Sequence, residues 1–195
     1  GIVDNKIKTE ASNYVNDKFA LENPNRLPYK ISNYQDRTRA FLQIQQGCDH
    51  RCTFCIIPYG RGSAFSLPVG EISRRIGDLI LRGFKEITLT GVDLTSYGND
   101  LPGKPKLGNV IKRLLLLHPK LARLRLSSID PAEIDGELLE LFQYEKKILP
   151  YIHLSLQSGD NMILKRMKRR HTREDVLSVF DKIKKQRDEV KFGAD

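Results

Sequence analysis

The sequence has no tryptophan, two methionines and three cysteines among its 195 residues. It also has no apolar run that approaches the ~20 residues a membrane-spanning helix requires. Its first residues lack the charged start and the apolar stretch of a secretory signal. These absences argue against secreted and membrane-spanning proteins, so we expect a cytoplasmic protein with no membrane partner.

All three cysteines, Cys48, Cys52 and Cys55, lie in the stretch GCDHRCTFCIIPYGRG. In a reducing compartment, clustered cysteines bind metal or perform redox chemistry more often than they form structural disulfides. A structural zinc site would need a fourth ligand, from His50 or from a more distant histidine. A redox pair of Cys52 and Cys55 would leave Cys48 without a role, and three inert buried thiols would leave the clustering unexplained.

An iron-sulfur cluster uses all three cysteines, because thiolate is the usual ligand of such clusters. A cubane cluster with three protein ligands has one open iron, much as catalytic zinc keeps an open coordination position. A fourth cysteine would block that iron. We therefore expect an iron-sulfur site that is open to a substrate, with zinc binding as the alternative.

The apolar pattern divides the chain into a polar segment, residues 1–39, and a domain, residues 40–195. The polar segment is interpreted as a linker or as the tail of a preceding domain. Because the chain starts with Gly1, we expect a piece of a longer protein. In the domain, strands are expected at residues 40–47, 85–91, 122–128, 151–159 and 189–195, and helices at residues 69–84, 108–119, 131–142 and 172–186. Pro131 and Thr172 are expected to open the last two helices.

This alternation predicts an α/β fold with a parallel sheet, since parallel neighbours need a crossover connection. An open doubly wound sheet and a partial barrel both fit the order of elements. The polar stretches CDHRC, TGVDL, SSIDP and QSGD all follow strand ends. Because α/β proteins gather their sites at the carboxyl edge of the sheet, these stretches are expected to meet there. His153, inside an apolar strand, is expected to be a core residue.

The chain has 33 lysines and arginines against 24 acidic residues, a formal charge of +9. This excess favours a polyanionic partner without identifying it. The densest basic run is KRMKRRHTR, residues 165–173. The run fits either a solvated helix face or contact with phosphates.

The spacing C-x3-C-x2-C, with Phe54 before the last cysteine, resembles the signature of radical S-adenosylmethionine enzymes. The stretches FLQIQQGCDHRCTFCIIPYGRG, LTGVDLTSYG, RLSSIDP, HLSLQSG and LKRMKRRHTRED follow in the order of the methylthiotransferase branch. The likeness runs from about Arg39 to Asp195 and is strongest to enzymes that act on N6-threonylcarbamoyladenosine in tRNA. It implies a partial (β/α) TIM-like barrel that ends in about its fifth or sixth strand.

The resemblance also implies a set of cofactor contacts. Cys48, Cys52 and Cys55 would hold a 4Fe-4S cluster, and S-adenosylmethionine would bind the open iron and give a 5′-deoxyadenosyl radical. The cofactor-binding positions would be Phe54, for adenine, then Gly91, Val92 and Asp93, for the methionine amino group, and Ser127, Ser128 and Gln157, for ribose or carboxylate. As alternatives, TGVD fits an ordinary turn, Ser128 and Asp130 fit helix caps, and Gln157 fits a turn that satisfies backbone groups.

The implied activity is addition of a 2-methylthio group to the hypermodified adenosine beside the anticodon of tRNA. The implied partners are the tRNA anticodon loop and a one-electron reductant such as a flavodoxin or ferredoxin. Family members also carry an N-terminal domain with three further cysteines and a small C-terminal β domain, which this chain lacks. Another tRNA adenosine, a ribosomal protein as substrate, and an inactive fragment that binds only metal are the alternative functions.

Overall fold

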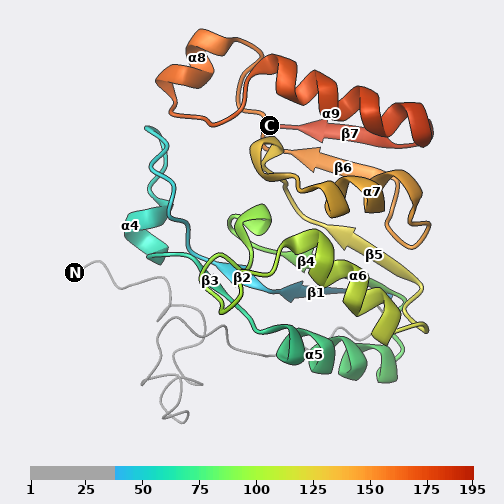
Figure 1. Cartoon of the computed structure of the whole chain (residues 1–195). Coiled ribbons are helices and arrows are strands. Elements are labelled where there is room, and N and C mark those ends of the chain that lie inside the picture. The colour runs from blue at the N-terminus through green and yellow to red at the C-terminus, as the bar shows by residue number, and fades with distance from the viewer. Residues whose placement is uncertain (1–37) are drawn as a thin grey trace.

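The computed structural model describes residues 38–195, so the predicted linker, residues 1–39, lies almost wholly outside the described residues. Five parallel strands alternate with helices (Figure 1). The strands are β1 (Arg39–Gln43), β4 (Glu86–Thr90), β5 (Arg123–Leu126), β6 (Tyr151–Leu154) and β7 (Lys191–Ala194). The longer helices are α5 (Val69–Leu81), α6 (Leu107–Leu117), α7 (Gly136–Tyr144) and α9 (Arg173–Gln186).

Shorter elements occupy the connections that follow the strands. They are β2 (Gln45–Gln46) and β3 (Phe65–Ser66), which pair antiparallel, the helices α4 (Ile57–Arg61) and α8 (Asn161–Arg166), and the 3-10 turns η1 (Leu94–Ser96) and η2 (Pro131–Glu133). Apolar periodicity does not reveal these elements, because each is too short to complete a period.

The strands are arranged in the order in which they occur in the chain. β1, β4 and β5 form one parallel sheet and β6 and β7 form another, while the isolated bridges Leu124–Ile148 and Ile129–Leu154 join the two. A doubly wound sheet would reverse its order at a switch point. The unreversed order is that of a (β/α) barrel, so the predicted fold class, a partial barrel, is confirmed.

The two faces of the sheet differ in chemistry. Leu42, Leu89 and Leu126 lie side by side in register on the face that packs against the helices, and each is at most 6% exposed. Side chains alternate along a strand, so Glu86 and Thr88 lie on the opposite face, hereafter the inner face. Only the helix-covered face therefore carries a continuous apolar core.

His153 lies on the inner face and is half-buried, whereas its strand neighbours Ile152 and Leu154 belong to the core. Its predicted place in the core is therefore wrong, because the alternation along β6 turns it to the other side. Within residues 38–195, no helix has the length and apolarity needed to cross a membrane.

The predicted helix starts have different outcomes. Thr172 caps α9 as expected, and it forms a capping box with Asp175. Pro131 opens only the 3-10 turn η2, and α7 starts later at Gly136, where Asp135 accepts a hydrogen bond from Leu138 N. The prediction of one helix from Pro131 is wrong because the Asp135 cap begins a separate helix.

Replacing Leu89 by alanine tests the core. Leu89 is fully buried in the central strand, so Leu89→Ala is expected to lower the free energy of unfolding by about 2–5 kcal/mol. Leu81→Ala is the matched control, because Leu81 is 86% exposed and its loss should change that free energy by less than about 0.5 kcal/mol. Urea denaturation of both variants measures the difference, and equal midpoints would contradict the assigned core.

Candidate functional site

A cavity of about 170 Å³ lies at the carboxyl edge of the sheet. The arrowheads of all five parallel strands point to the side of the molecule where α4 and α8 lie (Figure 1). The cavity is lined by residues from the connections that follow these strands: Cys48, His50, Cys52, Phe54, Cys55, Ile57, Val92, Asp93, Leu94, Ser128, Asp130, Ser155, Gln157 and Arg169. The expectation that the polar stretches after the strands meet at this edge is confirmed.

Gly47 fixes the start of the cysteine loop. Its φ is +70°, and a Cβ atom on it would lie only 2.0 Å from the carbonyl oxygen of Ser63. Next to it, Cys48 N donates to the carbonyl of Gly62 at 3.1 Å. Farther along, Thr53 N donates to the carbonyl of Met167 at 3.2 Å. The loop is therefore anchored at two points by its backbone, and Gly47 is required by both space and conformation.

The three thiols fit a cluster better than a single ion. None of the cysteines forms a disulfide, and each is half-buried at the cavity. One tetrahedral zinc ion would hold its sulfur ligands about 4 Å apart. Within residues 38–195, the only three metal-binding side chains with ligand atoms inside 4.8 Å of one another are Cys48, His50 and Asp93, so the three sulfurs do not converge. In a four-iron cluster each thiolate binds a different iron, which suits thiols around a shared cavity.

The Cys48 thiol lies beside the carboxylate of Asp93. Burial raises the pKa of the Cys48 thiol to about 12, and the neighbouring carboxylate of Asp93 adds to the increase. The Sγ atom lies 3.5 Å from Asp93 Oδ2, and the backbone N–H of His50 donates to it at 3.4 Å. Without a metal this thiol keeps its proton. A cation bound here would have to displace that proton, because only the thiolate is a ligand.

His50 holds two carboxylates together beside Cys48. Its Nε2 lies 2.8 Å from Asp93 Oδ2 and 3.5 Å from Glu133 Oε1. The hydrogen bond to Asp93, followed by that to Glu133, raises the pKa of His50 to about 9. Burial would raise the pKa of Glu133, but hydrogen bonds from His50, Arg170 and Ser96 together hold it well below its usual range. The Ser96 hydroxyl lies within 2.8 Å of both carboxylates, although its single proton serves one at a time.

Asp130 connects the end of β5 to the loop between α8 and α9. Three consecutive side chains surround its carboxylate: Arg169 at 3.2 Å, Arg170 at 2.8 Å and His171 at 3.6 Å. Arg169 also donates to the carbonyl of Ser155 at 2.7 Å and approaches Cys52 Sγ to 3.8 Å. Of the two alternatives for the basic run, the solvated helix face does not fit Arg169 and His171. The helix α8 ends at Arg166, and the side chains of Arg169 and His171 are only 10% and 0% exposed.

The remaining predicted cofactor positions divide into two groups. Phe54, Val92, Asp93, Ser128 and Gln157 line the cavity together with the three cysteines. Gly91 and Ser127 do not line it.

Gly91 instead makes room for the side chain of Gln45, from which a Cβ atom would be 3.0 Å away. The Gln45 amide oxygen accepts from Asp93 N at 2.8 Å, so Gly91 acts on the cavity through this contact. Ser127 has a buried Oγ without a hydrogen-bond partner in the described part of the chain, residues 38–195.

The turn and cap roles considered as alternatives for TGVD, Asp130 and Gln157 can be compared with the structure. The TGVD stretch does form the turn between β4 and η1, but the Asp93 side chain does not cap η1 and instead accepts a hydrogen bond from Ser96 Oγ at 2.8 Å. Asp130 does cap η2, accepting from Ala132 N at 3.0 Å, in addition to its contacts with the arginines. Gln157 has a φ of +68° and donates its N–H to the carbonyl of Asp195 at 2.8 Å. Sequence reasoning missed Ser96 and Glu133, because nothing in their local sequence shows that they meet His50.

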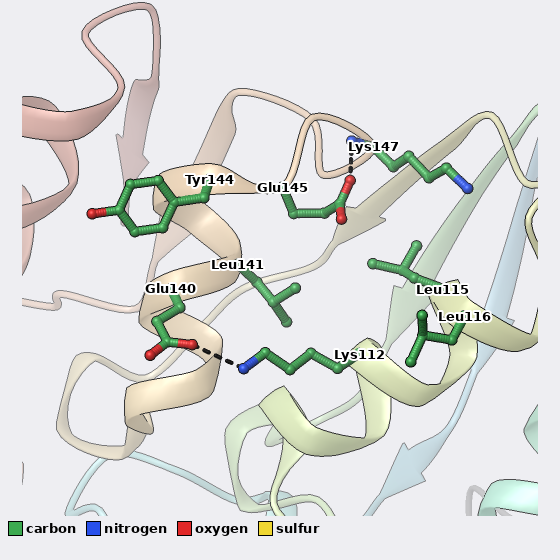
Figure 2. A pocket seen from close by; sticks show the side chains of 8 residues that line it. All are labelled: Lys112, Leu115, Leu116, Glu140, Leu141, Tyr144, Glu145 and Lys147. Carbon is green, nitrogen blue, oxygen red and sulfur yellow. Dashed lines mark hydrogen bonds and ion pairs between the residues drawn. The ribbon is translucent and has the colours of Figure 1, made fainter.

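A larger hollow of about 500 Å³ lies between α6 and α7 (Figure 2). Apolar side chains such as Leu116 and Leu141 line it, and an ion pair between Lys112 and Glu140 at 2.8 Å closes one side. None of the predicted site residues borders this hollow. The candidate site is therefore assigned to the cavity at the cysteines because of the side chains that line it, although the hollow between α6 and α7 has the larger volume.

The comparisons with known proteins agree with this site. The family model of the radical SAM superfamily matches residues 42–193, and the chain belongs to that superfamily. A protein of Rickettsia prowazekii (strain Madrid E), named threonylcarbamoyladenosine tRNA methylthiotransferase MtaB, is 56% identical over 165 residues, 85% of this chain and 39% of that protein. A tRNA-2-methylthio-N(6)-dimethylallyladenosine synthase of Wolbachia pipientis subsp. Culex pipiens (strain wPip) is 38% identical over 171 residues, 87% of this chain and 39% of that protein. The chain thus spans less than half the length of these relatives, and the resemblance inferred from the motifs is confirmed.

Two solved structures support the fold. The cobalamin-dependent S-adenosylmethionine radical enzyme OxsB superposes with a TM-score of 0.61 at 20% identity, over 79% of this chain and 23% of that one. The radical S-adenosylmethionine methyltransferase TsrM from Kitasatospora setae superposes with a TM-score of 0.62 at 14% identity, over 80% of this chain and 30% of that one. At such identities the likeness shows the fold alone.

Replacing Gly47 by alanine tests how the cysteine loop is held. Gly47→Ala would place a methyl group against the Ser63 carbonyl, so we expect the loop to move and Cys48 to become more exposed. The rate of Cys48 alkylation, measured by mass spectrometry, should rise at least several-fold. Gly70→Ala is the matched control, because no atom lies within 4 Å of the added Cβ. An unchanged rate in Gly47→Ala would show that the loop does not depend on this contact.

Proposed function

We propose that this chain is the radical core of a methylthiotransferase that modifies C2 of N6-threonylcarbamoyladenosine beside the anticodon of tRNA. The observation that carries the proposal is 56% identity to a relative named for this substrate, in a chain whose three cysteines share one cavity. Relatives named for N6-dimethylallyladenosine are only 35–38% identical. Residues 40–195 would form the core domain, and the preceding residues a linker.

In this proposal Cys48, Cys52 and Cys55 hold a 4Fe-4S cluster with an open iron. When bound, the cluster would supply the one electron that breaks a carbon–sulfur bond of S-adenosylmethionine, which would give methionine and a 5′-deoxyadenosyl radical. The chain's own residues would bind S-adenosylmethionine and orient it. Asp93, which is 9% exposed at the cavity, would accept a hydrogen bond from the methionine ammonium. His50 and Ser96 hold that carboxylate in place.

The rest of the cavity wall would surround the adenosyl part of the cofactor. Phe54 is 55% exposed and offers its backbone and ring to adenine, with Val92 on the adjoining wall. Ser128 and Gln157 supply polar groups for ribose or carboxylate. Neither Ser127 nor Gly91 lines the cavity, so these two residues would support the residues of the cavity wall without touching the cofactor themselves.

The partners follow from the same proposal. The formal charge of +9 favours tRNA as the polyanion, and a flavodoxin or ferredoxin in the cytoplasm would supply the electron. Full modification would also require the parts of the longer relatives that this chain does not span. The isolated chain is therefore expected to bind one cluster and S-adenosylmethionine without completing the transfer.

Anaerobic reconstitution with iron and sulfide tests the cofactor assignment. The chain should take up about four iron atoms, turn brown, and give a reduced electron paramagnetic resonance signal that shifts when S-adenosylmethionine is added. Cys52→Ala should lose that signal. Thr53→Ala, in the same loop, should retain it, because its side chain lies outside the cavity.

A colourless protein that prefers zinc would contradict the cluster assignment. A brown protein whose electron paramagnetic resonance signal does not change when S-adenosylmethionine is added would contradict the open iron. Methylthiolated tRNA formed by the isolated chain would contradict the requirement for further domains.

A further inference from the structure

Three arginines surround one carboxylate on the inner face of the sheet. Glu86 lies in register with Arg39 on β1 and Arg123 on β5. Its carboxylate is 2.6 Å from Arg39 Nε, 3.1 Å from Arg125 Nε and 3.4 Å from Arg123 Nε. Among residues 38–195, one negative charge thus faces three positive charges, which leaves an excess of two. An excess of guanidinium groups on a partly buried surface favours a carboxylate or phosphate ligand.

Arg125 is the cation of this cluster best placed to receive such a ligand. Its side chain is 24% exposed, and it lies 5.7 Å from the centre of the Tyr151 ring. Among residues 38–195, its one hydrogen bond is donated through Nε to Glu86, so the two terminal amino groups of the fork have no protein acceptor. Glu86 and Tyr151 therefore fix the plane of a guanidinium whose outer edge remains available.

Unpartnered polar atoms gather on the same face. Buried polar groups in proteins almost always have a hydrogen-bond partner. Among residues 38–195, six buried polar side-chain atoms have no partner, and three of them are Thr88 Oγ1, Ser127 Oγ and His153 Nδ1. These three side chains alternate with core residues along the chain, so they lie on the inner face. They come from β4, from the end of β5 and from β6. This independent observation indicates a polar ligand at this face rather than an apolar partner.

The inner face also offers an aromatic surface and leads to the cavity. Phe41 is 52% exposed and lies in one row with Thr88 and Arg125 across β1, β4 and β5. An exposed ring of this kind is a stacking surface for a nucleobase. Arg125 precedes Ser127 by two residues, about 7 Å along the strand, and Ser128 lines the cysteine cavity.

We infer that the inner face binds the substrate base, and that Arg125 binds the carboxylate at the end of its N6 substituent. The inference rests on the proposed function and deepens it. The threonylcarbamoyl group ends in a carboxylate, whereas the dimethylallyl group is neutral. With C2 turned toward the cysteine cavity, the N6 substituent extends along the sheet, where the arginine cluster lies. Arg125 thereby selects adenosines that carry an anionic substituent.

The test compares three nucleosides with the reconstituted chain. They are N6-threonylcarbamoyladenosine, its methyl ester and N6-dimethylallyladenosine, and binding is measured by calorimetry in the presence of S-adenosylmethionine. The ester keeps the size of the substituent and removes only its charge. The acid is expected to bind at least about tenfold more tightly than either neutral nucleoside, the factor typical of one charge-assisted hydrogen bond.

Two variants assign that preference to a residue. Arg125→Gln is expected to remove the preference for the acid and to leave the affinity for the ester unchanged, which also shows that the variant is folded. Arg82→Gln is the control, because it removes one exposed charge beyond the end of α5. That variant should keep the full preference.

Equal affinities for the acid and the ester would overturn the inference, as would an Arg125→Gln variant that still prefers the acid. A chain that takes up the cluster and S-adenosylmethionine but binds no nucleoside would overturn it as well, while leaving the cofactor assignment intact. Failure of cluster uptake would instead contradict the proposed function.

Discussion

The parallel register of β1, β4 and β5 is the constraint on which the rest of the structure depends. Because the strands run the same way, their carboxyl ends reach one edge, and the connections there bring the cysteines and Asp93 to one cavity. Because the strands are in register, their apolar side chains form one layer under the helices. The same register leaves polar side chains, including Glu86, on the inner face. Site and core are thus two consequences of one arrangement.

Charge pairs then hold the connections at that edge. Asp130 follows β5 and binds Arg169 and Arg170 from the loop after α8, while His50 of the cysteine loop binds Asp93 after β4. These contacts join segments that are 39 to 43 residues apart in the chain. Removing one member would leave a buried charge without its partner, which costs more than the pair itself contributes. The cysteine loop is therefore positioned by the whole edge of the sheet.

Sequence reasoning identified what depends on local patterns. The parallel α/β order, the Thr172 cap and the cavity position of the three cysteines all follow from periodicity or from a short motif. It could not find contacts that depend on tertiary placement. The helix predicted from Pro131 was displaced by the cap at Asp135, and His153 was turned to the inner face by the phase of β6.

The arginine cluster shows the same limit. Arg123 and Arg125 are separated from Glu86 by more than thirty residues, and only strand register brings them together. In sequence the basic run, residues 165–173, fitted either a solvated helix face or contact with phosphates, yet Arg169 is nearly buried because it pairs with Asp130 and Ser155. Long-range pairing of this kind has no periodic signature.

The proposed function requires that the three cysteines hold a cluster whose open iron binds S-adenosylmethionine. Electron–nuclear double resonance tests it most directly, on the reduced reconstituted chain with S-adenosylmethionine isotopically labelled at its amino nitrogen. We expect a hyperfine coupling to that nitrogen, because the amino group would be a ligand of the iron. A cluster signal without any coupling to the label would show that the amino group does not bind the iron, and the proposed open-iron site would then be wrong.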